Sequence, residues 1–151
     1  NLLAASDLAE STLETALTAI QKTKDDRGIL IGASAVSLHI PVDYWAVADR
    51  VLSSPGNTQT SAAAADPNTN AINAIRHMGM VPEGYHINRR FTDTDAWFVK
   101  TDVPNGTKMF VRSPLQTKME PDFDTGNLRF KARERYSFGV SDWRGWYGSA
   151  G

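Results

Sequence analysis

The chain has 151 residues, of which 41% are hydrophobic and 22% are charged, with a net charge of −1. This length suits one domain or a compact piece of a larger protein, and the composition argues against wholesale disorder. The absence of cysteine excludes disulfides, thiolate metal sites and a cysteine nucleophile, and no apolar run reaches the roughly 20 residues of a membrane helix.

Charge and aromatic content divide the chain near residue 88. Residues 1–87 contain 5 Lys/Arg and 9 Asp/Glu, a net of −4, whereas residues 88–151 contain 11 and 8, a net of +3. Only 3 of the 14 aromatic residues precede residue 88. We therefore predict a helix-rich part over 1–87 and a β-rich part over 88–151.

The first elements follow from the spacing of apolar residues. Steps of three and four from Leu2 to Ile20 predict an amphipathic helix. The turn-forming residues 25–28 follow it, and two short apolar runs, Ile29–Ile31 and Val36–Ile40, predict strands.

The next segment predicts a second helix and a loop. Pro41 ends the preceding run and favours a helix start, and apolar spacing continues to Val51. Residues 53–70 are small and polar, and we interpret them as a mobile surface loop. Four apolar residues after the loop are expected to return to the core: Ile72, Ile75, Met78 and Met80.

Two turns are predicted within the β-rich part. Asn105-Gly106 stands between the apolar runs 96–101 and 107–112, which predicts a hairpin formed by those two runs. Residues 122–127 predict a second turn.

The most informative pattern covers residues 128–140. Every second residue from Leu128 to Val140 is apolar except Glu134, which predicts one long strand with an apolar and a basic face. We expect the apolar face to pack on the core. The basic face carries Arg129, Lys131, Arg133 and Arg135.

Three interpretations of this basic face are open. It contacts nucleic-acid phosphates, it pairs with acidic surfaces of neighbouring subunits, or it is a solvated face that blocks edge aggregation. A net charge of +3 is small for a dedicated nucleic-acid binder.

No catalytic, cofactor or metal pattern stands out. The three histidines have no zinc-site spacing, and nucleophile-elbow and phosphate-loop motifs are absent. Paired aspartates occur at 25/26, 93/95 and 122/124, and convergence of the last two pairs leaves a carboxylate-dependent hydrolase as an alternative. Because all three pairs lie in predicted turns, we favour a structural role for them and predict no catalytic, metal or cofactor site.

Several segments, taken in their order along the chain, are similar to those of a known protein family. The segments are LHIP at 38–41, YWAVADRVLSS at 44–54, RRFTDTDAWF at 89–98, NLRFKARERY at 127–136 and DWRG at 142–145. Together they resemble the C-terminal part of tailed-bacteriophage major capsid proteins, over essentially the whole chain.

The resemblance implies a fold and a structural role. The fold would be α+β and part of the tailed-phage capsid fold, with 1–87 similar to the axial domain and 88–151 returning to the peripheral domain. The protein would form hexamers and pentamers in an icosahedral shell around double-stranded DNA. Its location would be the virion, and the bacterial cytoplasm before assembly, with no membrane partner.

The same resemblance suggests residues for contacts between subunits. We predict that the basic strand face takes part, together with the aromatic corner Asp142, Trp143 and Arg144. A small nucleic-acid-binding module stays open as a further alternative.

Overall fold

The computed structural model of the chain describes residue 3, residues 5–56 and residues 72–151, which form two compact units. Unit 1 comprises Asn1–Pro104 and Trp143–Gly151, and unit 2 comprises Asn105–Asp142. Most of the predicted loop at 53–70 lies outside the described residues. The division at residue 87, which follows charge and resemblance, stays a prediction.

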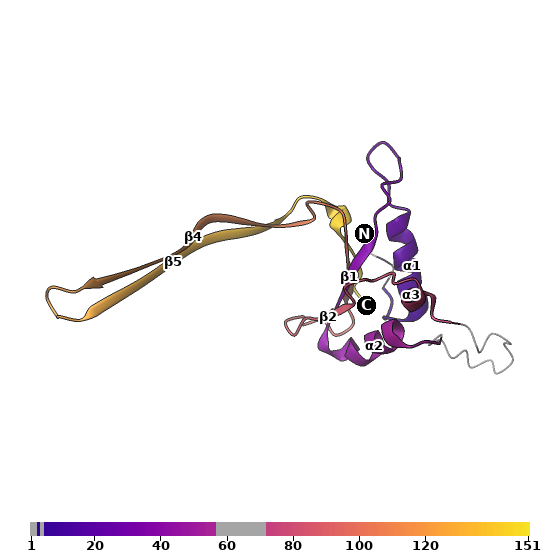
Figure 1. Cartoon of the computed structure of the whole chain (residues 1–151), viewed down its shortest axis with the longest axis horizontal. Coiled ribbons are helices and arrows are strands. Elements are labelled where there is room, and N and C mark those ends of the chain that lie inside the picture. The colour runs from indigo at the N-terminus through magenta and orange to yellow at the C-terminus, as the bar shows by residue number, and fades with distance from the viewer. Residues whose placement is uncertain (1–2, 4, 57–71) are drawn as a thin grey trace. The chain divides into compact units, whose positions relative to one another are not determined.

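Unit 1 is a mixed sheet with helices. Its strands follow the order β2-β1-β3-β6, with β1 parallel to β2 and antiparallel to β3, and β3 antiparallel to β6. Figure 1 shows α1 and α2 beside this sheet. The elements are α1 (Glu10–Gln21), β1 (Ala35–Ile40), η1 (Val42–Tyr44), α2 (Trp45–Ser53), α3 (Ala74–His77), β2 (Tyr85–Ile87), β3 (Trp97–Thr101), η2 (Trp143–Gly145) and β6 (Trp146–Ser149).

The core of unit 1 lies between the helices and one face of the sheet. Alternate residues of β3 are buried, because successive side chains of a strand point to opposite faces. In β1 the alternation is broken, because Ser37 and Leu38 are both buried next to an irregularity in the register. The cluster includes Leu13 and Ile20 of α1, Leu38 of β1, Val51 of α2 and Trp97 of β3. These helices and the strand β1 confirm the sequence-based expectation for this segment.

The helix α1 begins later than predicted, at Glu10 rather than near Leu2. The preceding chain is held by β3 and β6: the indole Nε1 of Trp97 donates to the carbonyl of Ser6 at 3.0 Å, and the amide of Ser6 donates to Ser149 Oγ at 3.1 Å. These long-range bonds keep residues before the helix in an extended path.

Two expectations for the core were wrong. Ile29–Ile31 forms no regular strand, and only Leu30 makes an isolated bridge, to Lys24. Ile72 and Met78 are exposed, whereas Ile75 is buried and Met80 packs against the core. The short helix α3 turns only one of its faces inward, so spacing alone did not select the buried residues.

Unit 2 is a two-stranded antiparallel hairpin made by β4 (Thr107–Pro121) and β5 (Leu128–Val140) (Figure 1). The long strand and the turn at 122–127 are therefore confirmed. The predicted hairpin between 96–101 and 107–112 was wrong, because β3 pairs with β1 and β6 while β4 pairs with β5. Asn105 does take a left-handed conformation, with φ 67°, but its carbonyl accepts from Asp142 at the base of the hairpin.

Candidate subunit interface

The β4–β5 hairpin is held by a ladder of backbone hydrogen bonds. It starts at the base, where Ser141 donates its amide hydrogen to Gly106 O at 3.0 Å, and ends at the turn, where Asp122 donates to Asn127 O at 2.8 Å. Gly126 has φ +69°, and its amide bonds Asp122 O at 2.9 Å, so a side chain there would be strained. Irregular pairing between Val111 and Gln116 interrupts the register.

One face of the hairpin is apolar and exposed. Residues opposite each other across the ladder share a face. The apolar pairs are Met109 with Phe138, Val111 with Tyr136, Met119 with Phe130 and Pro121 with Leu128. Phe138 is 71% exposed and Phe130 is 61% exposed. Our expectation that this face packs on the core was therefore wrong, because alternation reveals an apolar face but not what covers it.

The opposite face of the hairpin is basic. Arg129 lies opposite Glu120, Lys131 opposite Lys118, Arg133 opposite Gln116 and Arg135 opposite Ser113. All four predicted basic residues therefore share one face.

Among the residues that the structure describes, one of these four cations forms a salt bridge. The guanidinium of Arg129 pairs with the carboxylate of Asp122 at 2.6 Å. Lys131, Arg133 and Arg135 form no salt bridge with any residue that the structure describes. Lys131 and Lys118 lie directly opposite each other across the ladder, and like charges in such a pair repel.

The predicted aromatic corner is organised within its own chain. Arg144 donates from Nε to the carbonyl of Lys24 at 3.1 Å and from Nη2 to Asp26 Oδ1 at 2.5 Å, and its guanidinium lies 4.6 Å from the centre of the Trp143 ring. Trp143 is 55% exposed. The amide of Asp142 bonds Asn105 O in the hairpin base. A role for these three residues in subunit contacts stays a prediction.

Sequence reasoning missed the contribution of β4 to the apolar face. The alternation in β4 is visible at Met109 and Val111 but is lost where the register shifts, next to Pro114. A bulge reverses which residues face one side, so a period-two pattern cannot be followed through it. The regular alternation of β5 was the clearest signal in the sequence for this face.

The paired aspartates lie in short connections between elements. Asp93 and Asp95 lie in unit 1, where the bond between their carboxyl groups lowers the pKa of Asp93 and raises that of Asp95. Asp122 lies in unit 2, and its carboxylate accepts from Thr125 and from Arg129. Both sets serve turns, which is the role that the sequence favoured.

A histidine cluster occupies the sheet of unit 1. The ring centre of His39 lies 5.2 Å from that of His86 and 4.9 Å from that of Trp146. Burial lowers the pKa of His39 below its ordinary value of 6.5, and the charges of His86 and Lys100 lower it further, while Glu83 opposes them. Within residues 5–56 and 72–151 no group of three or more His, Cys, Asp or Glu side chains is placed to hold a metal ion.

A comparison with models of known protein families identifies the family of this chain. A family model described as phage capsid protein matches residues 1–149. The chain belongs to the phage capsid protein family. This confirms the resemblance drawn from the ordered segments and the α+β fold, and it gives this capsid chain a structural role. It gives no support to a hydrolase.

Other comparisons add less. A solved chain from Mycobacterium phage Che8 is similar to this capsid chain, with 18% sequence identity and a TM-score of 0.48, over 99% of this chain and 53% of that one. The chain thus spans about half the length of that relative. No curated protein matches it significantly. In the parts of the capsid chain that the structure describes, no helix is long and apolar enough to cross a membrane.

Proposed function

We propose that this chain is a major capsid subunit of a tailed phage or prophage, that it assembles with copies of itself into hexamers and pentamers of an icosahedral shell, and that it has no catalytic activity. The observation that carries the proposal is the family match over residues 1–149. The exposed hairpin fits it, because a two-stranded hairpin is marginal alone in water and large exposed apolar patches mark interaction sites.

Within this proposal, the basic face of β5 contacts a neighbouring subunit. Lys131, Arg133 and Arg135 lack salt bridges among the described residues, and residues 1–87 carry a net charge of −4. We infer that acids of a neighbouring copy face these cations and set the register between subunits. Charge complementarity of this kind contributes to specificity more than to affinity.

The proposal also covers the aromatic corner and the division of the chain near residue 87. Asp142, Trp143 and Arg144 would lie near a subunit contact, with residues 1–87 in the axial part and 88–151 leading to the peripheral part. The packaged DNA would be an indirect partner. The location would be the virion, reached from the host cytoplasm.

The test removes charge from the strand. Arg133→Ser with Arg135→Ser should leave the chain folded, because both side chains are exposed. Electron microscopy of the chain should then show few or aberrant particles. The matched control is Arg89→Ser with Arg90→Ser, which removes the same charge from exposed positions outside the hairpin.

Two outcomes would contradict the role proposed for the basic face or the proposal as a whole. Normal particles at normal yield from the Arg133/Arg135 variant would leave the solvated-face interpretation in place. DNA binding by the unassembled chain, with a steep salt dependence, would instead favour the nucleic-acid-binding module, because phosphate contacts release counterions.

A further inference from the structure

Two histidines lie beside each other where β2 joins the sheet of unit 1. His39 of β1 and His86 of β2 are direct partners in the parallel register, and their ring centres lie 5.2 Å apart. His39 is half-buried and His86 is exposed. Because histidine is the side chain that ordinarily changes charge between about pH 5 and 8, the β1–β2 contact contains two groups that mild acid can charge.

The surroundings of His39 disfavour a positive charge on its ring. Burial lowers the pKa of His39, and the charges of His86 on β2 and Lys100 on β3 lower it further. Glu83, just before β2, acts in the opposite direction, and the uncharged ring of Trp146 on β6 also lies beside the histidine. A state in which the His39 ring leaves these surroundings binds a proton more readily, so acid favours that state.

The strand β2 is short and lies at an edge. It has three residues, none of them buried, and it lies at the end of the described sheet next to β1. On either side of β2, the amide of Glu83 donates to Val36 O at 3.0 Å and the amide of Asn88 donates to Ile40 O at 2.8 Å. Short, exposed segments of this kind open locally at a lower free energy than core strands do.

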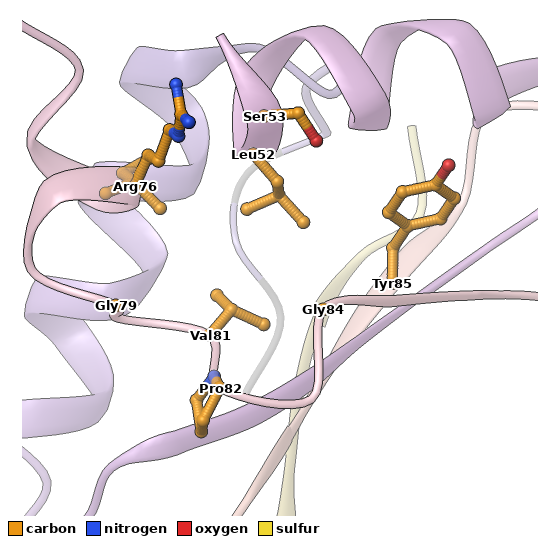
Figure 2. Close-up of a pocket in the computed structure, with 9 residues that line it drawn as sticks. Leu52, Ser53, Arg76, Gly79, Val81, Pro82, Gly84 and Tyr85 are labelled. Atoms are coloured by element: carbon orange, nitrogen blue, oxygen red, sulfur yellow. The ribbon is translucent and has the colours of Figure 1, made fainter. Parts of the chain in front are cut away.

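The segment that leads into β2 also borders a hollow. A pocket of about 280 Å³ lies between this segment, the end of α2 and α3. Figure 2 shows the side chains of Leu52, Val81, Pro82 and Tyr85 around it. Side chains beside an empty volume lack the dispersion contacts that a filled one provides, so less packing opposes their release. Val81 is buried and anchors the start of the segment, which leaves residues 82–88 as the part that can move.

We propose that the His39–His86 pair is a pH-sensitive switch: at neutral pH the uncharged rings allow β2 to pair with β1, and in mild acid their mutual repulsion releases residues 82–88 while the rest of unit 1 stays folded. Release frees the carbonyls of Val36 and Ile40, so that β1 becomes an edge strand with unpaired backbone groups. The switch operates within one chain and does not depend on assembly.

Hydrogen exchange at single amides tests the switch. The amides of Glu83 and Asn88 report on the β1–β2 contact, and the amide of Asp102, which donates to Ser34 O at 3.0 Å, reports on the opposite side of β1. After correction for the intrinsic effect of pH, protection of the first two should fall between pH 7.5 and 5.0 in low-salt buffer. The expected loss is at least about fourfold, the factor for two unit charges about 5 Å apart in water. Asp102 should stay more protected than both at pH 5.0.

A histidine variant isolates the pair. His86→Gln removes one of the two charges at an exposed position and should reduce the acid loss at Asn88 by about the same fourfold factor. His77→Gln, at an exposed position on α3, is the matched control and should keep the full loss. Circular dichroism at pH 7.5 checks that both variants are folded.

Two further variants test the sign of the effect. Glu83→Gln removes the negative charge that favours a charged His39, so the acid loss at Asn88 should grow. Lys100→Gln removes a positive charge that disfavours it, so the loss should shrink. A purely structural effect of either substitution would not follow the sign of the charge removed.

Three results would overturn the switch. Unchanged protection at Glu83 and Asn88 between the two pH values would show that acid does not release β2. Equal protection of Asn88 and Asp102 at pH 5.0 would show that β2 opens only when the whole unit unfolds. An acid loss that is the same in His86→Gln and His77→Gln would show that the histidine pair is not its source.

Discussion

The two units of this protein place similar amphipathic strands in different surroundings. In unit 1, β1 and β3 turn an apolar face toward helices, and Leu38, Trp97 and Val99 are fully buried. In unit 2, β4 and β5 also carry an apolar face, yet Phe130 and Phe138 are mostly exposed. The difference shows that an amphipathic strand provides an apolar face, but that this face is buried only where another element packs against it.

The comparison also predicts where stability resides. Unit 1 gains from burial of apolar surface, at roughly 25 cal/mol per Å². Unit 2 depends on its backbone ladder and on cross-strand pairs, each contributing about 0.2–1 kcal/mol. We therefore expect unit 1 to determine the free energy of unfolding of the isolated chain.

The largest expected effect comes from Trp97→Ala. It removes a fully buried ring and its bond to Ser6, so the free energy of unfolding should fall by about 3–5 kcal/mol in urea titrations. The same aromatic truncation in unit 2, Phe138→Ala, should lower it by less than about 1 kcal/mol. Equal losses from the two variants would show that the hairpin face is covered in the isolated chain.

A smaller effect concerns acid and unit 1. Because the pKa of His39 lies below 6.5 in the folded chain, the unfolded chain binds a proton first as the pH falls. The free energy of unfolding should therefore decrease below about pH 6.5 and level off once the pH passes below the folded pKa. Urea titrations of His39→Gln at pH 7.5 and 5.0 should show a smaller decrease than the unmodified chain.

The control for this pH effect is His77→Gln, an exposed histidine at the end of α3. It should keep the full decrease between the two pH values. If His39→Gln and His77→Gln respond alike, the ring cluster at His39, His86 and Trp146 is not the source of the acid sensitivity.

The smallest expected effect concerns Asp26→Asn, which removes the salt bridge between Arg144 and the turn that follows α1. The Asp26 side chain is 91% exposed, so the loss should be no more than about 1 kcal/mol. Hydrogen exchange at the Ile31 amide should become faster, while global unfolding stays unchanged. Asp43→Asn, at an exposed position in η1, is the control, and an unchanged Ile31 exchange rate would show that the ion pair does not order the loop.

Local patterns in the sequence predicted several elements closely. The alternation over 128–140 identified β5, and the turn residues at 122–127 identified the end of the hairpin. Apolar spacing identified α1 and α2, although not the start of α1. These signals succeed because period and turn chemistry are properties of neighbouring residues.

These local patterns did not predict which strands pair with each other. Asn105-Gly106 suggested that β3 and β4 pair, but β3 lies between β1 and β6. At Gly148 of β6, a Cβ atom would lie 2.4 Å from the Phe98 ring, so the β3–β6 contact depends on this glycine. Register with distant strands follows from such packing, which no local window contains.

By itself, the sequence determined the long two-faced strand, the basic row on one of its faces and membership of the phage capsid family. The tertiary structure alone decided that the apolar row of β5 stays uncovered and that Arg144 pairs with Asp26, which is distant in the sequence. The physical reason is that side-chain period is local, whereas burial depends on which distant segments the folded chain brings together.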